Sequence, residues 1–140
     1  MALKKHLCLV FISFGFIGLQ ASDLKVRLQN IAHREGQILV GIFKPDSDFP
    51  DLQSAFAAKK IEAKVPEVTL LFEDIPEGRY AVAVFHDKNL NGRLDKNFLG
   101  IPREGFGFSR DAPARFGPPA FKAAAFDFNS SLVLKIKLRY

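Results

Sequence analysis

The sequence predicts an all-β fold: an antiparallel β-sandwich of about seven strands, with one short helix and a long loop rich in Gly, Pro and Phe. Short segments alternate apolar and polar residues with the period of two that a pleated strand imposes. Turns rich in Gly, Pro and Asn separate these segments, which is typical of sandwiches. The chain has 140 residues, 48% of them hydrophobic, which is enough for the core of one domain.

Six segments carry the strand pattern. They are residues 24–30, 37–43, 68–73, 79–86, 121–128 and 132–140. Segment 79–86 is apolar at every position from Tyr80 to Phe85, so both of its faces are expected to be covered, as in a central strand. Within residues 46–64 the alternation breaks, and Asp51 is expected to cap a short helix that begins at Leu52. A transmembrane barrel is the rival fold, but strands that are apolar on both faces favour the sandwich.

The first 21 residues have the form of a secretory signal peptide. Lys4 and Lys5 precede the apolar run 7–19, which is shorter than the roughly 20 residues of a spanning helix. Cleavage is expected after Ala21, and an uncleaved anchor is the alternative. The interpretation leaves residues 22–140 as a single domain, exported to the periplasm or secreted, with no cysteine because Cys8 is removed.

The exported domain is not expected to bind nucleic acid. Removal of Lys4 and Lys5 lowers the formal charge from +5 to +3, and the remaining basic residues form no cluster in the sequence. No membrane span is expected after cleavage of the leader. An envelope protein or a glycan is the expected partner class, and neither the ligand nor the oligomeric state follows from the sequence.

A candidate metal site follows the strand 79–86. The residues at positions one, three, five, seven and nine of a D-x-N-x-N-G-x-x-D loop are Asp87, Asn89, Asn91, Arg93 (through its backbone) and Asp95. Oxygen ligands at alternate positions and a glycine at position six suit Ca²⁺. Position twelve is Phe98 rather than Glu, so any affinity is expected in the weak range of about 10⁻⁴ to 10⁻³ M. The alternative is a turn whose Asp and Asn side chains bond its own backbone. Glu104 is a candidate to complete either arrangement.

A candidate binding surface follows in the same long loop. The segment 98–121 is too irregular for a strand and too aromatic for a solvated loop, which leaves an aromatic platform or a satellite core as alternatives. The residues expected to form the surface are Phe98, Arg103, Phe106, Phe108 and Phe116, with Arg110 and Arg115 at the rim.

No catalytic residues are assigned from the sequence. His86 lies beside Asp87, yet no nucleophile motif accompanies this pair, and a histidine at the end of a strand is commonly structural. The leading interpretation is therefore a non-enzymatic binding or assembly module of the bacterial envelope. The alternative is an enzyme acting on envelope or extracellular material, centred on His86, Asp87 and Asp95.

Two sequence motifs resemble known families. The string IPEGRYAV (75–82) resembles the turn and strand entry L-P-x-G-x-Y-x-V of transthyretin-like and carboxypeptidase-regulatory-like sandwiches, which are Ig-like in architecture. Five further strings resemble the bacterial family called domain of unknown function 2141. They are AVFHD (83–87), NLNGRLD (89–95), NFLGIP (97–102), EGFGFS (104–109) and FGPP (116–119). The resemblance covers about residues 24–140 and implies an exported bacterial β-sandwich, without an assigned activity.

Overall fold

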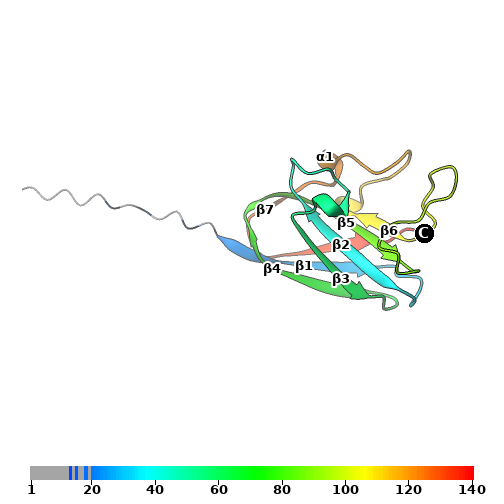
Figure 1. Ribbon diagram of the computed structural model, residues 1–140. Helices are drawn as coiled ribbons and strands as arrows, with labels where there is room; N and C mark the ends of the chain where they lie inside the picture. The colour runs from blue at the N-terminus through cyan, green and yellow to red at the C-terminus, as the bar shows by residue number, and fades with distance from the viewer. Residues whose placement is uncertain (1–12, 14, 16–17, 19) are drawn as a thin grey trace, which may run out of the picture.

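The computed structural model describes residues 13, 15, 18 and 20–140 (Figure 1). Most of the predicted signal peptide, residues 1–21, therefore lies outside the described residues. Within the described part of the chain, no helix is both long and apolar enough to cross a bilayer.

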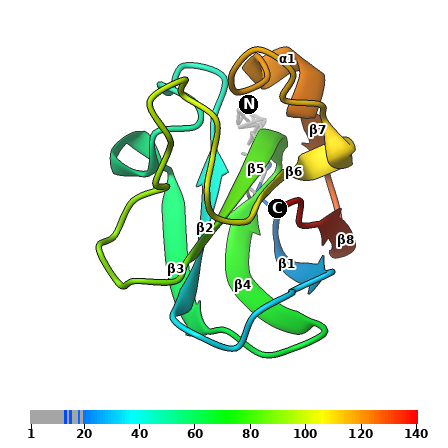
Figure 2. The same ribbon diagram turned by 90° about the vertical axis from the view of Figure 1, so that its right-hand side faces the viewer.

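The described chain folds into two β-sheets (Figures 1 and 2). The three-stranded sheet has the order β4-β1-β8, and its strands are β1 (Ala21–Gln29), β4 (Val68–Pro76) and β8 (Leu132–Lys137). The five-stranded sheet has the order β3-β2-β5-β6, with β7 paired to β5. Its strands are β2 (Gln37–Phe43), β3 (Ala57–Glu62), β5 (Gly78–Asp87), β6 (Phe106–Phe108) and β7 (Phe126–Phe128). The all-β sandwich predicted from the sequence is confirmed.

The helical elements of the described chain are short. A 3₁₀ turn, η1 (Leu52–Ser54), begins after Asp51, whose Oδ1 accepts a hydrogen bond from the Gln53 N–H at 3.0 Å. The short helix expected after Asp51 is thus this single turn. The other two elements are η2 (Ser109–Asp111) and α1 (Phe121–Ala124).

The strand predicted over residues 121–128 is wrong in its first half. Residues Phe121–Ala124 form α1, and only Phe126–Phe128 pair with β5. Ala123 and Ala124 favour a helical turn, and the Ser109 hydroxyl donates a hydrogen bond to the Ala124 carbonyl at 2.5 Å. This tertiary contact holds the turn against the five-stranded sheet.

Two strands have no counterpart among the sequence predictions. β3 lies at the edge of its sheet, and its Lys59 and Lys60 face solvent. Exposed lysines commonly protect a sheet edge from pairing with another chain, but here they interrupt the alternation of apolar and polar residues that would predict a strand. β6 has only three residues, Phe106–Phe108, and lies inside the segment that was expected to be irregular. Its pairing with β5 supplies the order that the local sequence does not predict.

The last strand joins the first in parallel, whereas the other pairs in the described sheets are antiparallel. β8 runs beside β1 with Leu24 opposite Leu132, and it ends at Lys137 rather than at the C-terminus as predicted. Beyond it, Arg139 exchanges two backbone hydrogen bonds with Phe106 of the other sheet, at 2.8 and 3.0 Å. The C-terminal segment therefore ties the two sheets together.

The two faces of β5 are buried in two different apolar clusters. Tyr80, Val82 and Val84 belong to the inner core between the sheets, together with residues of β1, β2, β4 and β8. Ala81, Ala83 and Phe85 face the opposite side, where a second cluster includes Phe43, Phe108 and Ala124 under the loops. The uniformly apolar sequence of this strand thus reflects a central position covered on both sides.

Tyr80 offers a test of this register. Its side chain is buried, its hydroxyl donates to the Pro76 carbonyl at 2.8 Å, and its ring meets Phe128 edge to face. Tyr80→Ala is expected to lower the free energy of unfolding by about 3 kcal/mol, because a large side chain leaves a cavity in the inner core. Tyr80→Phe, which removes only the hydroxyl, is expected to cost about 1 kcal/mol. Urea unfolding measures both values, and a loss near zero for the alanine variant would contradict the register.

Candidate functional site

The candidate site is the loop of residues 88–105 at the end of β5. β1 and β5 run in the same direction, so the loop lies at the end of the sandwich opposite Ala21, where β1 begins (Figure 1). Figure 2 views the domain from the end that carries the loop. The loop leaves from a buried strand, which gives its base a fixed starting point.

Asp87 anchors the start of the loop. Its carboxylate is fully buried and accepts three hydrogen bonds, from Gln37 Nε2 (2.9 Å), the Asn91 N–H (3.0 Å) and the Gly92 N–H (2.8 Å). Gly92 adopts a φ of 79°, which a glycine takes without the steric cost of a side chain. The three donors satisfy a charge that would otherwise be costly to bury.

Glu104 closes the other end of the loop. It is only 5% exposed, and its two carboxylate oxygens accept hydrogen bonds from the backbone N–H of Lys88 (2.9 Å) and of Asp95 (3.0 Å). The Arg103 N–H also donates to the Asp95 carbonyl at 2.8 Å. One buried carboxylate therefore fixes the first residue of the loop and its midpoint at the same time.

The Asp95 carboxylate is hydrogen-bonded to both asparagine side chains of the motif. Its oxygens accept hydrogen bonds from Asn91 Nδ2 at 2.8 Å and from Asn89 Nδ2 at 2.5 Å. These two bonds, with weaker help from the charges of Arg93 and Arg103, lower the pKa of Asp95 despite an opposing effect of desolvation. The pKa of Asp95 is therefore lower in the folded than in the unfolded chain, so the ionised carboxylate stabilises the fold. This stabilisation is fully present above the ordinary Asp pKa and is lost as the pH falls through the folded pKa.

The five predicted metal ligands are thus close together, but hydrogen bonds connect them. The Asn89 Oδ1 accepts the Asn91 N–H at 3.3 Å, and the Asn91 Oδ1 accepts the Arg93 N–H at 3.1 Å. Among the described residues, no three or more His, Cys, Asp and Glu side chains are grouped closely enough to hold a metal ion. The arrangement observed is the self-bonded turn that was the alternative to a calcium site.

His86 is used structurally. It is fully buried, and its ring nitrogens lie 2.7 Å from the Glu35 carbonyl oxygen (Nε2) and 2.7 Å from the Tyr140 hydroxyl (Nδ1). A carbonyl only accepts, so Nε2 carries the proton and Nδ1 accepts from the tyrosine. The Tyr140 hydroxyl in turn accepts the Ala32 N–H at 3.2 Å. A general base at His86 would require the loss of these bonds.

Some members of the site were not found by sequence reasoning. Gln37 and Tyr140 lie 50 and 54 residues from their partners in the chain, so no local pattern marks them. Gly36 also belongs here, because a Cβ at its position would lie 2.1 Å from the Asp87 carbonyl oxygen. Its glycine lets the turn before β2 lie directly against the start of the loop.

The predicted aromatic surface divides into exposed and packed residues. Phe98 is 95% exposed, Phe116 is fully exposed and Arg103 is exposed. Phe108 is 4% exposed, belongs to the second apolar cluster and meets Phe49 edge to face, and the half-buried Phe106 packs against that cluster. Phe98 and Phe116 are therefore available to a partner in this structure, whereas Phe108 is not.

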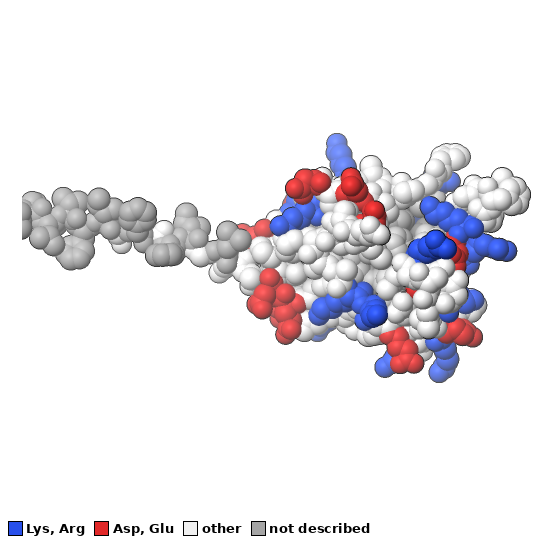
Figure 3. All heavy atoms as spheres, in the orientation of Figure 1, with Lys and Arg blue, Asp and Glu red and all other residues white. Residues whose placement is uncertain are grey.

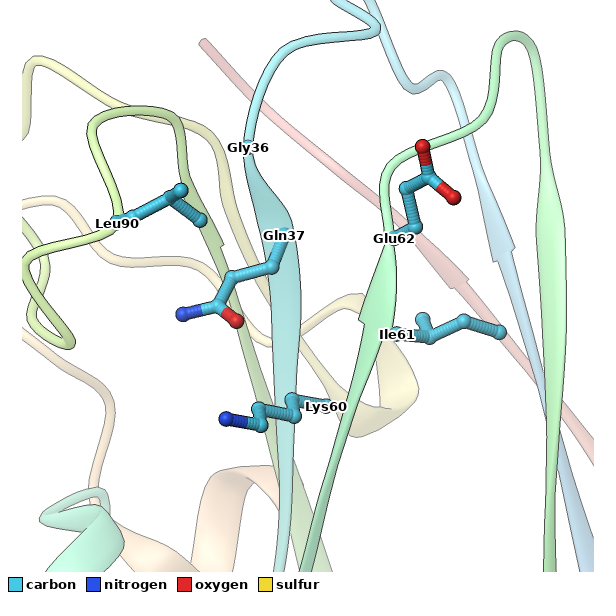
Figure 4. Close-up of a pocket in the computed structure, with 6 residues that line it drawn as sticks. All are labelled: Gly36, Gln37, Lys60, Ile61, Glu62 and Leu90. Atoms are coloured by element: carbon cyan, nitrogen blue, oxygen red, sulfur yellow. The ribbon is translucent and has the colours of Figure 1, made fainter.

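An open depression of about 490 Å³ lies beside the loop (Figure 4). Its lining residues are Gly36, Gln37, Lys60, Ile61, Glu62 and Leu90. Gln37 and Lys60 extend toward the side on which Leu90 lies, and Ile61 extends to the other side. The lining offers one acidic and one basic side chain and no nucleophile, so it does not resemble a catalytic pocket.

The role of Asp87 can be tested by a neutral replacement of the same shape. Asp87→Asn places an amide donor against backbone N–H donors, and we expect a loss of about 2–4 kcal/mol in the free energy of unfolding. The matched control is Asp46→Asn, because Asp46 is exposed, with an expected change within about 0.5 kcal/mol. Equal losses in the two variants, measured by urea unfolding, would show that the carboxylate does not anchor the loop.

Comparison with known proteins gives one family. The family model for domain of unknown function 2141, described as an uncharacterized protein conserved in bacteria, matches residues 26–134. No curated protein and no solved structure gives a match. The matched range includes the five-stranded sheet, β4 and parts of β1 and β8, together with the buried carboxylates Asp87 and Glu104 and the whole loop between them. The chain therefore belongs to the bacterial family domain of unknown function 2141.

Proposed function

We propose that this protein is an exported, non-enzymatic binding or assembly module of the bacterial envelope, and that it acts through the tip of the 88–105 loop. The observation that carries the proposal is the contrast between the two parts of this loop. Its base is fixed by two buried carboxylates, Asp87 and Glu104, while its tip exposes large apolar side chains such as Phe98. Large apolar side chains exposed to water do not contribute to the stability of the fold, and a cluster of them on the surface is typical of a site that binds a partner.

The fixed base favours binding for a thermodynamic reason. A loop that is already ordered loses little conformational entropy when it meets a partner, so more of the contact energy contributes to affinity. Four hydrogen bonds from backbone N–H groups of the loop to Asp87 and Glu104 hold the loop without any ligand. The bonds to Asp87 also occupy one of the carboxylates on which the alternative enzyme would be centred.

Export is supported by the sequence of the leader. The basic residues Lys4 and Lys5, the apolar run 7–19 and the short polar segment before Ser22 are the three parts of a secretory signal. The domain that remains has no cysteine, so its stability in an oxidising compartment depends on packing and hydrogen bonds alone.

Expression of the full chain in a bacterial host tests both parts of this proposal. We expect a product that begins at Ser22 by N-terminal sequencing and that is recovered outside the cytoplasm, bound to the envelope fraction. Val10→Arg, which interrupts the apolar run of the leader, is expected to keep the product in the cytoplasm.

The binding part of the proposal has its own variant and control. Phe98→Ser with Leu99→Ser is expected to release the exported product from the envelope fraction, because it removes the apolar tip. Val133→Ser, at an exposed valine on β8, is the matched control and is expected to remain bound. An uncut cytoplasmic product, or equal retention of tip variant and control, would contradict the proposal.

A second proposal is that the Asp87–Asp95 segment takes up Ca²⁺ weakly. The supporting observation is that Asn89 and Asn91 already point their amides at the Asp95 carboxylate. Rotation of each amide by half a turn exchanges its nitrogen for its oxygen and turns three side chains into oxygen ligands around one point. Lys88, Arg93 and Lys96 oppose the binding of a cation, which is consistent with an affinity in the weak extracellular range.

Thermal melting tests the calcium proposal. At about 5 mM Ca²⁺, a Kd of about 10⁻⁴ to 10⁻³ M would stabilise the fold by about 1–2 kcal/mol and raise Tm by roughly 3–10 °C relative to a chelator. Asp95→Asn is the variant expected to lose this increase, and Asp127→Asn, at an exposed strand residue, is the control expected to keep it. An unchanged Tm of the natural chain would exclude calcium at this concentration.

A further inference from the structure

We propose that the partner of the loop tip is the surface of a bilayer that contains anionic phospholipid. The inference rests on the proposed function, because it names the chemistry of what the exposed tip binds. Four features of the described loop carry it: its exposed apolar residues, its rigid hairpin, its excess of positive charge and its narrow projecting shape.

The apolar residues of the tip are unusually exposed. Phe98 is 95% exposed, Leu99 67% and Ile101 56%. Exposure of large apolar side chains to water costs free energy in proportion to their apolar area, and several exposed together in one place are informative. Three of them within four residues of one hairpin indicate a surface that is covered when a partner binds.

The tip is held by hydrogen bonds of the Asn97 side chain and backbone. The Asn97 Oδ1 accepts hydrogen bonds from the Leu99 N–H (2.9 Å) and the Ile101 N–H (3.0 Å), and the Asn97 N–H donates to the Ile101 carbonyl at 2.9 Å. Lys96 and Pro102 face each other across this small hairpin. Because Asn97 satisfies the polar groups at the turn, the neighbouring side chains Phe98, Leu99 and Ile101 are free to point outward.

The charged side chains of residues 88–103 are mostly positive. The basic residues between positions 88 and 103 are Lys88, Arg93, Lys96 and Arg103. The only acid in this range is Asp95, and its carboxylate is already bonded to two asparagine amides. The ion pairs found among the described residues, Arg27–Glu67 and Arg79–Asp127, use none of these cations. Figure 3 shows several Lys and Arg side chains at the right-hand end of the domain, the loop end in Figure 1, with some Asp and Glu side chains among and below them.

This combination fits a lipid surface better than a protein or a glycan. A bilayer interface accepts apolar side chains at a shallow depth, and its anionic headgroups attract each nearby Lys or Arg. A stable protein interface needs a broad surface of roughly 800 Å² on each partner, whereas the tip is a narrow hairpin that projects from the domain (Figure 1). Phe98 is the one aromatic ring of the hairpin 96–102, and Leu99 and Ile101 offer no flat ring on which a sugar stacks.

Vesicle flotation tests the inference directly. The purified protein is expected to float with vesicles of phosphatidylglycerol and phosphatidylcholine, to float less with phosphatidylcholine alone, and to be released as salt rises, because screening weakens the attraction of the loop cations. Phe98→Ser with Leu99→Ser is expected to weaken the partition by at least about tenfold. The matched control, Leu71→Ser with Val133→Ser, removes two exposed apolar residues from the opposite sheet and is expected to stay within about twofold.

The charge component has its own pair of variants. Arg93→Gln with Lys96→Gln is expected to weaken binding to the anionic vesicles by about tenfold and to reduce its dependence on salt. Lys25→Gln with Lys135→Gln removes the same charge from the exposed face of the three-stranded sheet and is expected to have little effect. All the substituted residues are on the surface, so an unchanged Tm confirms that each variant is folded.

Insertion of the tip can be followed without interference, because the natural sequence contains no tryptophan. In the variant Phe98→Trp, fluorescence is expected to shift to shorter wavelength on addition of anionic vesicles. The control Val133→Trp is expected to show no shift. Absence of vesicle binding by the natural chain, or equal shifts for the two tryptophans, would overturn the inference.

The test separates this inference from the proposed function. Release of the tip variant from the envelope fraction without binding to vesicles would favour an envelope protein as the partner and would reject the lipid surface. Flotation in calcium and in a chelator distinguishes the inference from the calcium proposal, because the tip cations act without a metal. Equal binding to the vesicles in both solutions supports the lipid surface as the partner. This conclusion does not depend on whether calcium raises Tm in the melting experiment.

Discussion

The arrangement of the loop end depends on a single buried carboxylate. Asp87 ends the central strand β5, accepts a hydrogen bond from Gln37 on the neighbouring strand and accepts two more from the loop that follows. A buried carboxylate without these donors would cost much free energy. The end of β5, the side chain of Gln37 on β2 and the start of the loop therefore have to keep the positions that form these hydrogen bonds. Glu104 repeats the principle at the other end of the loop, where two backbone N–H groups are its donors.

The rest of the fold supplies a rigid support for that end. β5 is covered on both faces by separate apolar clusters, which leaves its terminal residues little freedom. The C-terminal segment crosses from one sheet to the other through Arg139 and Phe106, and Tyr140 then bonds to His86 next to Asp87. Burial raises the pKa of the Tyr140 hydroxyl, which keeps its proton available for this hydrogen bond. The beginning, middle and end of the described domain therefore meet at the base of the loop.

The chemistry of the loop changes from its base to its tip. At the base, acidic oxygens are buried and bonded to N–H donors, and at the tip, apolar side chains and cations face water. This division is the reverse of an open acidic cleft, in which carboxylates would face a substrate. The division favours a loop whose conformation is fixed by buried carboxylates at its base and whose apolar and basic tip faces a partner.

The sequence by itself determined the β class, the strand Gln37–Phe43, the double burial of β5 and the turn chemistry of D-x-N-x-N-G, because these depend on local alternation and on the backbone preferences of Asn, Asp and Gly. Tertiary structure alone decided that Phe121–Ala124 is helical, that β6 exists, and that Phe108 packs while Phe98 is exposed. These outcomes depend on contacts with residues distant in the chain, such as Ser109 with Ala124 or Phe108 with Phe49, and such pairings leave no periodic signal in a single sequence.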